Sequence, residues 1–584
     1  MGQVQIQHRG QNFFRGAMIL TASALLVKLV GALYKIPLQN LIGGLGMSYF
    51  NTAYMLFNLL YAVSVAGLPV AVARMVAESS SQGRYKDVRR ILSISRQAFL
   101  LTGVVGTAVM AALSWVFSWS VNNQDAWLCV VSLSPAVFFC CVLSSYRGYY
   151  EGLRNMFPTA LSQLVEAIVK LAAGLTLSYL ITKAGAVQYR ETGAVFGRVV
   201  SSMEEAMTTV LPYAAAGAIL GVTLSTAASA LFLFLRHRIA GDGITRQDLL
   251  LSPAPSERPE LKKQLWKIAL PVCIGALVLN ITSLIDLMSI MNRLNVAVNN
   301  GSETIWKMYE GLLPYGMSNE NLPRYLYGVY SAIPLTLFHL IPAITSTFAV
   351  SALPNVTIAW TQRDRKGLKR RIDSVLRLTS LVVMPAAWGL ILLAGPILSL
   401  LLVAQPAEAQ LGAPLLRVLG AGVFLIGFSM PLSSILQAMG RSALPARYTV
   451  MGAVVKLVVN FTLVAVPSIN IQAAPYGTLA CYLLIFLLNY WSVTKNAHIR
   501  VDIIGVFLKP LFAGAICGGT ARLFYQILLH PMGSSLATIL GICLGAVIYG
   551  IVLLLIRAVR KEDLIVLPFG EKIAKILAKF RLIR

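Results

Sequence analysis

The sequence predicts an all-α polytopic membrane protein with about fourteen transmembrane helices. Of the 584 residues, 57% are hydrophobic and only 12% are charged, whereas an ordinary soluble domain has about 25% charged residues. A hydrocarbon core about 30 Å thick requires roughly 20 apolar residues for each helix that crosses it. Apolar runs of this length recur along nearly the whole chain, so the bilayer is expected to be the main solvent of the protein.

Apolar runs separated by polar or charged segments mark the expected helices. The first run follows several basic residues but continues through Lys28 to Pro37 without a convincing cleavage site, so it is interpreted as a retained first span. The expected spans are residues 17–37, 51–77, 97–120, 127–147, 159–182, 208–235, 265–291, 325–350, 374–403, 411–437, 446–467, 474–494, 504–529 and 533–556.

The formal net charge of +26 is explained mainly by topology. With the N-terminus inside, the inner loops and tails hold 33 of the 49 Lys and Arg residues, and the outer loops hold six. This asymmetry follows the positive-inside rule, so both termini are expected to face the cytoplasm, and the charge gives no reason to expect nucleic acid as a partner. The basic tail at 559–584 carries an apolar helical stripe and is expected to lie along the inner interface.

An internal duplication relates the two halves of the chain. Residues Glu166–Leu177 match Gly452–Leu463 at an offset of 286 with six identities in twelve, which aligns Lys170 with Lys456. Shorter matches follow in the same order, and they predict two pseudo-symmetric six-helix lobes of the same orientation, a common transporter plan. The expected domains are an N-lobe at 1–236, a cytoplasmic linker at 237–264, a C-lobe at 265–494, two additional helices at 495–558 and the tail at 559–584.

Ten further basic residues fall within spans or at their rims. A charge near the bilayer centre costs roughly 2.5–3.5 kcal/mol on insertion scales, so an unneeded one should be rare. Four of the ten lie near span ends, where a long side chain can reach water: Lys267, Arg377, Arg417 and Lys509. Arg522 is left unassigned. The candidates for a cationic, substrate-binding cavity are Lys28, Lys35, Arg74, Lys170 and Lys456.

Only Glu166 and Asp286 oppose these cations within the spans, as charge-balancing or ion-coupling residues. Glu166 precedes Lys170 by one helical turn, and an ion pair between them would make Lys170 a structural charge. Asp286 has no close basic neighbour in the sequence, so it either neutralises a lysine across the cavity or binds a coupling ion.

Signatures of catalysis and metal binding are missing from the sequence. There is no Walker A, HExxH or GxSxG motif, and the five histidines form no ligand-like cluster. All seven cysteines lie in apolar runs without the spacing of metal ligands. We therefore expect no catalytic residue, metal or cofactor, and a transporter rather than an enzyme, driven by a sodium or proton gradient or by the membrane potential.

Two N-terminal segments carry a family resemblance. Lys28-Leu-Val-Gly31 with Tyr34-Lys-Ile-Pro37, and the later Gly67-Leu-Pro-Val-Ala-Val-Ala-Arg74, resemble the stage V sporulation and MurJ-type flippases of the multidrug/oligosaccharidyl-lipid/polysaccharide (MOP) exporter superfamily. The resemblance implies a MATE- and MurJ-like fold of two lobes with two added helices. It also implies transfer of a lipid-linked sugar precursor, such as lipid II, to the outer leaflet. The basic-x-x-Gly segment of the family's cationic cavity matches Lys28 to Gly31, whereas the family's second arginine falls on Tyr34, beside Lys35.

The leading hypothesis is a flippase that moves an undecaprenyl-pyrophosphate-linked saccharide by alternating access, in cell-wall, spore-cortex or polysaccharide synthesis. The expected location is the bacterial cytoplasmic membrane, and the protein is expected to be a monomer. The expected partners are the lipid-linked substrate and the bilayer. Cell-wall synthesis proteins are a further candidate partner. Two alternatives stay open. A multidrug or cation exporter of the same superfamily should have an acidic site, and a membrane-embedded glycosyltransferase or polymerase should have outer loops rich in carboxylates or histidines.

Overall fold

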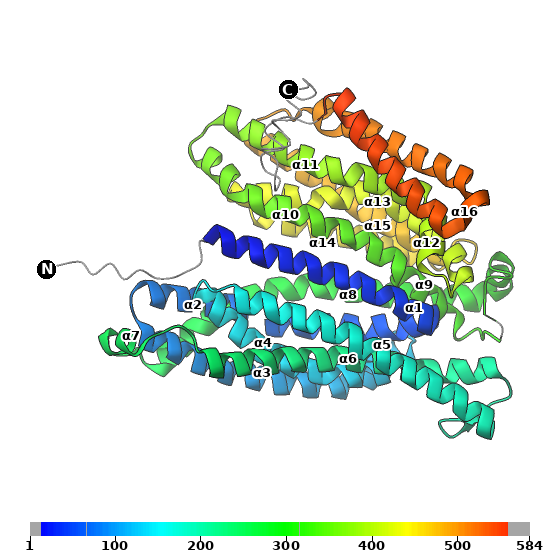
Figure 1. The fold of residues 1–584 in the computed structure, drawn as a ribbon, viewed down its shortest axis with the longest axis horizontal. Coiled ribbons are helices and arrows are strands. Elements are labelled where there is room, and N and C mark those ends of the chain that lie inside the picture. Colours follow the sequence, from blue (N-terminus) through cyan, green and yellow to red (C-terminus); the bar gives the residue numbers. More distant parts are fainter. Residues whose placement is uncertain (1–12, 66, 315, 559–584) are drawn as a thin grey trace. The chain divides into compact units, whose positions relative to one another are not determined.

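The computed structural model describes residues 13–65, 67–314 and 316–558, and nearly all of them are helical (Figure 1). The all-α prediction is confirmed. The predicted interfacial tail at 559–584 lies outside the described residues. Contacts divide the chain into two compact units, residues 1–288 and 289–584, and this boundary falls within the predicted seventh span.

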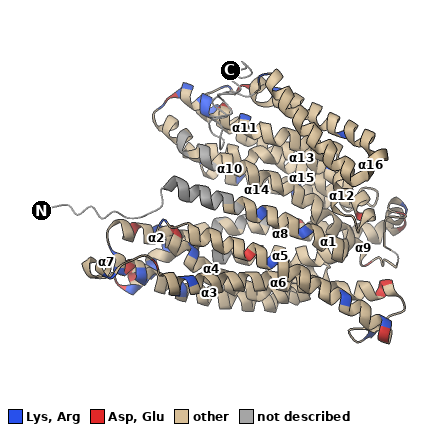
Figure 2. Cartoon of the chain, viewed as in Figure 1, with Lys and Arg blue, Asp and Glu red and all other residues tan. Residues whose placement is uncertain are grey.

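The N-terminal unit is built from long helices and one short hairpin. The helices pack side by side with their charged residues mostly near their ends (Figure 2). The elements are α1 (Phe13–Val65), α2 (Leu68–Ser81), α3 (Tyr85–Ser120), η1 (Gln124–Ala126), α4 (Trp127–Gly152), α5 (Phe157–Thr192), the strands β1 (Ala194–Val195) and β2 (Arg198–Val199), α6 (Met203–Ala240), α7 (Arg246–Leu251) and α8 (Arg258–Met308), which runs on into the second unit.

The C-terminal unit is also a helical bundle. A five-residue π-helical turn, η3, leads into its last helix, which is the longest one that begins in this unit. The elements are α9 (Leu322–Ser331), α10 (Ile333–Thr361), α11 (Arg365–Leu392), α12 (Ala394–Leu401), α13 (Pro406–Ala438), α14 (Ala443–Leu463), η2 (Asn470–Gln472), α15 (Ala473–Ala497), η3 (Ile504–Leu508) and α16 (Lys509–Leu555).

Eleven helices among the described residues are long and apolar enough to cross a membrane. Two of them contain a glycine outside the helical region: Gly43 (φ 60°, ψ −176°) in α1 and Gly533 (φ 75°, ψ 166°) in α16. A positive φ is cheap only for glycine, so each glycine lets two apolar segments follow one another without a loop. The breaks separate the predicted spans 1 and 2, and 13 and 14, while the count of about fourteen stays a prediction.

The predicted span at 51–77 is wrong as a single helix. Its residues are shared between the end of α1 at Val65 and α2, which begins at Leu68 with Pro69 in its first turn. Between them, Gly67 lies against α8, where an added Cβ would overlap the backbone oxygen of Ala269. Proline is compatible with a helix start but not with its interior hydrogen bonds, which explains why α2 begins here.

Helix packing supports the predicted duplication. In the N-terminal unit, α2 packs against α3 and α4, α4 packs against α3 and α6, and α5 packs against α6. In the C-terminal unit, α10 packs against α11 and α13, α13 packs against α11 and α15, and α14 packs against α15. The two sets follow the same order along the chain, as expected for an internal repeat.

The tightest approach in the N-terminal unit is between α5 and α6. At Gly221 of α6, an added Cβ would overlap the backbone of Gly174 in α5, and at Gly174 it would meet the hydroxyl of Tyr34 from α1. Small residues allow membrane helices to approach closely and gain van der Waals contact. Gly174 therefore accommodates both the α6 backbone and a tyrosine of α1.

We predict that Gly221→Ala lowers the free energy of unfolding by about 1–3 kcal/mol, the usual cost of overpacking. The added methyl group would meet the backbone of Gly174 rather than a mobile side chain. Denaturant titration in detergent measures the change. Gly519→Ala in α16 is the matched control, because its Cβ would enter open space, and equal stability of the two variants would contradict this account of the α5–α6 contact.

Candidate functional site

The structure places four of the five predicted cavity cations in the N-terminal unit. Lys28 and Arg74 are exposed on α1 and α2, and Lys35 and Lys170 are partly buried on α1 and α5. Lys35 and Lys170 lie close enough to repel each other electrostatically. Among the described residues, no hydrogen bond, ion pair or cation–π contact links Lys28 or Arg74 to this pair, so the structure brings together two of the predicted cations.

Lys35 is held by the second half of α1. Its ammonium donates a hydrogen bond to Oδ1 of Asn51 at 3.3 Å, and Asn51 is buried. The two residues face each other because the chain turns at Gly43 between them. The glycine break thus converts a sequence separation of sixteen residues into a contact.

Lys170 lies against two tyrosine rings. Its Nζ is 5.1 Å from the ring centroid of Tyr34 and 5.3 Å from that of Tyr54. Such cation–π contacts contribute about 0.5–2 kcal/mol, more when the cation is desolvated. The Tyr34 hydroxyl donates to the backbone oxygen of Ala218 in α6 at 3.1 Å, so the ring position is fixed by a third helix. The ring faces stabilise the ammonium without neutralising its charge.

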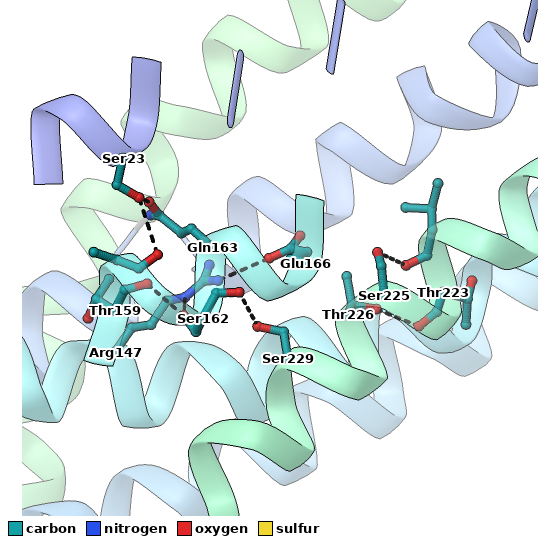
Figure 3. A network of polar contacts seen from close by, with 12 residues as sticks. Ser23, Arg147, Thr159, Ser162, Gln163, Glu166, Thr223, Ser225, Thr226 and Ser229 are labelled. Carbon is teal, nitrogen blue, oxygen red and sulfur yellow. Dashed lines mark hydrogen bonds and ion pairs between the residues drawn. The ribbon is translucent and has the colours of Figure 1, made fainter. Parts of the chain in front are cut away.

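Glu166 forms its ion pair with Arg147 rather than with Lys170, which was the open alternative, although Glu166 still attracts the Lys170 ammonium electrostatically. Arg147 Nη2 of α4 lies 3.0 Å from Glu166 Oε2, and Arg147 Nε donates to the Ser162 hydroxyl at 3.0 Å (Figure 3). The guanidinium fork holds two groups of α5 at once, a geometry that an ammonium cannot provide. Lys170 is one turn further along, where its ammonium lies over the two rings instead.

A hydroxyl network extends this contact to neighbouring helices (Figure 3). Ser229 of α6 donates to the backbone oxygen of Ser162 at 2.8 Å. Ser23 of α1 donates to Gln163 Oε1 at 2.8 Å. Because membrane helices gain little from apolar contact with one another, such interhelical hydrogen bonds help to fix their register. The network connects α1, α4, α5 and α6 beside the lysine pair.

We call Tyr34, Lys35, Tyr54, Glu166 and Lys170, together with Arg147, the cation cluster. It has three basic groups and one carboxylate, so its net charge is positive. Because the carboxylate is engaged by Arg147, the two lysines remain available to an anion. In the described part of the chain, no group of three or more His, Cys, Asp or Glu residues is placed to hold a metal ion.

Sequence reasoning missed Arg147, Tyr34 and Tyr54 as parts of this site. The predicted fourth span ends at residue 147, whereas α4 continues to Gly152, so Arg147 is a helical residue whose side chain is 14% exposed. The signal that could have placed it is the absence of a proline between Arg147 and Gly152, where the helix ends. No sequence signal identified the tyrosines, because their role depends on which helices pack against α5.

The fifth cation, Lys456, lies on α14 of the C-terminal unit. It is partly buried and stands thirteen residues after the first residue of its helix, as Lys170 does in α5. Its side chain packs close to Gly477 of α15, where an added Cβ would be 3.5 Å from Lys456 Cγ. The repeat therefore places a partly buried lysine at the same helical position in each unit. Asp286 is also partly buried, in α8.

The four cations predicted to reach water from span ends differ in their surroundings. Lys267 and Arg417 are exposed, and the Lys509 ammonium donates to the backbone oxygen of Ile556 at 2.8 Å. The prediction is wrong for Arg377, which is 1% exposed. Asp373, one turn earlier on α11, attracts it electrostatically, so the charge of Arg377 is accommodated within the protein.

We predict a larger coupling energy between Glu166 and Arg147 than between Glu166 and Lys170. A double-mutant cycle with Glu166→Gln and Arg147→Met should give about 1–3 kcal/mol, typical of groups in direct contact within one network. The parallel cycle with Lys170→Met is the control and should give clearly less. Both are measured by denaturant titration in detergent. A larger coupling energy for Glu166 with Lys170 than for Glu166 with Arg147 would contradict the ion pair that the structure shows.

These features define the class of protein. The multi-pass helical chain has the fold of the MOP exporter superfamily, as its match to solved structures of that superfamily shows. A solved structure of the lipid II flippase MurJ, in an inward closed conformation, matches it with a TM-score of 0.59 and 12% sequence identity, covering 91% of this chain and 98% of that one. At this identity the likeness concerns the fold alone.

The sequence comparisons give the family. Residues 13–313 match the family described as polysaccharide biosynthesis protein, and residues 325–462 match the family described as MatE. Since the first match covers more than half of the chain, the protein belongs to the polysaccharide biosynthesis protein family. Stage V sporulation protein B of Bacillus subtilis (strain 168) is 24% identical over 561 residues, covering 96% of this chain and 98% of that protein. Lipid II flippase MurJ of the same organism is 22% identical over 502 residues, covering 83% and 82%.

Proposed function

We propose that the protein is a flippase that moves an undecaprenyl-pyrophosphate-linked saccharide of the lipid II class across the bacterial cytoplasmic membrane by alternating access. It acts as a transporter and not as an enzyme, with both termini in the cytoplasm. The observation that carries the proposal is the cation cluster of the N-terminal unit, where Lys35 contacts Asn51, Lys170 lies over two tyrosine rings and Glu166 is engaged by Arg147.

The electrostatics of the cluster favour an anionic substrate. Two ammonium groups that repel each other are destabilised when the site is empty, and an anion placed near both relieves that repulsion. Ammonium groups bind phosphate oxygens through short, charge-assisted hydrogen bonds. A pyrophosphate carries several negative charges next to a lipid tail, so it is the part of a lipid-linked saccharide that such a site recognises.

Lys456 supplies a second cationic position in the C-terminal unit. It occupies the helical position equivalent to that of Lys170, and alternating access in two-lobe transporters moves one lobe against the other around the substrate. We therefore include Lys456 among the residues that serve the pyrophosphate during the proposed cycle. Lys28 and Arg74, both exposed, contribute to the attraction of the anion into the cavity.

The rival function is export of an organic cation, which the match to the MatE family brings into consideration. A cation exporter requires a carboxylate that is available to its substrate. In the cluster, Glu166 is engaged by Arg147 and lies beside two further cations, an arrangement that repels an organic cation. The lipid-linked anion is therefore the preferred substrate class.

We predict that Lys170→Ala reduces flipping of a lipid II-class substrate at least about tenfold, because it removes a charge that the pyrophosphate needs. The measurement is a leaflet-resolved assay in proteoliposomes, run with lipid II, with another undecaprenyl-pyrophosphate saccharide and with a dye cation. Lys170→Arg should retain part of the activity.

Lys183→Ala is the matched control, since Lys183 lies on the same helix and is exposed; it should flip at the normal rate. Size-exclusion profiles and circular dichroism establish that each variant is folded. Normal flipping by folded Lys170→Ala and Lys456→Ala proteins would remove the cationic site, and transport of the dye alone would favour the exporter.

We further propose that Asp286 on α8 binds the coupling ion if flipping responds to a sodium or proton gradient. The carboxylate is partly buried within a predicted span, and ionisable groups in such positions commonly mark ion pathways. Asp286→Asn is then expected to abolish the response to the ion gradient in the same vesicles, while a response to the membrane potential persists. An unchanged gradient response in this variant would leave Asp286 without this role.

A further inference from the structure

A surface pocket of about 260 Å³ lies in the N-terminal unit where α3 begins and α6 ends. It is separate from the cation cluster, and the distribution of basic residues places it on the proposed cytoplasmic side. Its volume is somewhat below the roughly 300–1,000 Å³ of pockets for drug-sized ligands, so it suits a small group. It is lined by Arg89, Leu92, Ser93, Arg96, His237, Gly241 and Asp242.

The one carboxylate of the pocket, Asp242, is committed to internal partners. Its oxygens accept hydrogen bonds from Arg89 Nε at 3.3 Å, from the Tyr149 hydroxyl at 2.9 Å and from the Ile244 backbone N–H at 3.0 Å. Burial raises the pKa of Asp242, but the hydrogen bonds from Arg89, Ile244 and Tyr149 outweigh burial and hold that pKa below its ordinary value. Asp242 therefore remains an anion that orients Arg89.

Arg96 is the unneutralised cation of the pocket. Its side chain is exposed, and its guanidinium carbon lies 5.8 Å from the ring centroid of Tyr146. Among the described residues, no salt bridge involves Arg96. His237 also lines the pocket, and its Nδ1 is 3.1 Å from the Tyr150 hydroxyl. Burial is the main cause that lowers the pKa of His237; Asp242 opposes this shift, and Arg96 and Arg89 add to it. Two arginines and one carboxylate give the pocket lining a net positive charge.

The internal repeat provides a comparison for Arg96. The segment Arg-Arg-Ile-Leu-Ser-Ile-Ser-Arg at 89–96 aligns with Arg-Arg-Ile-Asp-Ser-Val-Leu-Arg at 370–377, so Arg96 corresponds to Arg377 and Leu92 corresponds to Asp373. In the C-terminal unit, Arg377 is buried and Asp373 attracts it. In the N-terminal unit, Leu92 replaces that carboxylate and Arg96 faces a pocket. The N-terminal copy therefore lacks the carboxylate that lies one helical turn before the arginine in its duplicate.

We propose that this pocket binds a phosphate group, with Arg96 and Arg89 as its cationic ligands and Ser93 as a hydroxyl donor. A guanidinium fork matches two phosphate oxygens and binds them more strongly than a neutral donor does. The bound group supplies the negative charge that Asp373 supplies in the other unit, and it connects α3 to the end of α6. The phosphate belongs either to a soluble small molecule or to the headgroup of an anionic lipid at the interface.

Two arms of one experiment distinguish the sources in the full-length protein. In detergent, the unfolding temperature is measured against inorganic phosphate, with chloride at equal ionic strength as reference. In lipid nanodiscs, it is measured with phosphatidic acid and with phosphatidylcholine. A saturable rise in the first arm identifies a soluble phosphate, and a rise in the second arm alone identifies a lipid headgroup. The apparent affinity in the responding arm should fall at least about tenfold in Arg96→Gln.

Arg370→Gln is the matched control, because Arg370 is an exposed arginine of the same motif in the other unit, and its phosphate response should equal that of the unmodified protein. Lys170→Ala should also respond normally, so this proposal and the proposed flippase site fail independently. If Arg96→Gln does not fold, Arg96→Lys keeps the charge, loses the fork and should still weaken the response. Stabilisation in neither arm, or stabilisation that persists in the folded Arg96 variant, would overturn the proposal.

Discussion

One constraint dominates the packing of the N-terminal unit: an ammonium group inside a membrane helix needs partners that stabilise it. Lys170 lies over the rings of Tyr34 and Tyr54, and those rings are available only because α1 and α6 approach α5 closely. Gly174 permits the approach of α1, since a side chain there would meet Tyr34, and Gly221 permits the approach of α6, since a side chain there would meet the α5 backbone. Helix packing and the electrostatics of the site therefore depend on the same contacts. The packing of α1 and α6 against α5 also positions the aromatic rings that stabilise the ammonium group.

The two repeats have diverged, so corresponding basic residues have different surroundings in the two units. Lys170 and Lys456 keep the same helical position, in keeping with a shared demand for positive charge in both lobes. Arg96 and Arg377 also correspond, but Arg377 is buried near Asp373 whereas Arg96 is exposed beside Leu92. The copy with Asp373 thus has a carboxylate one turn before its arginine, whereas the copy with Leu92 has an arginine that lines a surface pocket.

Much of the fold follows from the sequence because apolar runs of bilayer length leave helices as the main way to satisfy backbone hydrogen bonds. Predicted and observed helices differ where backbone geometry decides. The break before α2 arises at Gly67 and Pro69, where proline and close packing outweigh hydrophobicity. Arg147 was placed at a span end because hydropathy falls there, although α4 continues beyond it. Hydropathy indicates whether a segment lies in lipid or in water, but it does not indicate the residue at which its helix ends.

The sequence by itself determined the membrane class, the helical content, the repeat and the correspondence of Lys170 with Lys456, because these properties depend on composition and on order along the chain. Only the tertiary structure decided what neutralises each charge. Glu166 could pair with Lys170 on its own helix or with a cation on another, and the contact of α4 with α5 resolves this in favour of Arg147. The tertiary structure therefore decides where the excess of Lys and Arg over Asp and Glu produces a positively charged site. The charge of a site depends on which helices pack together and not on which residues are near in sequence.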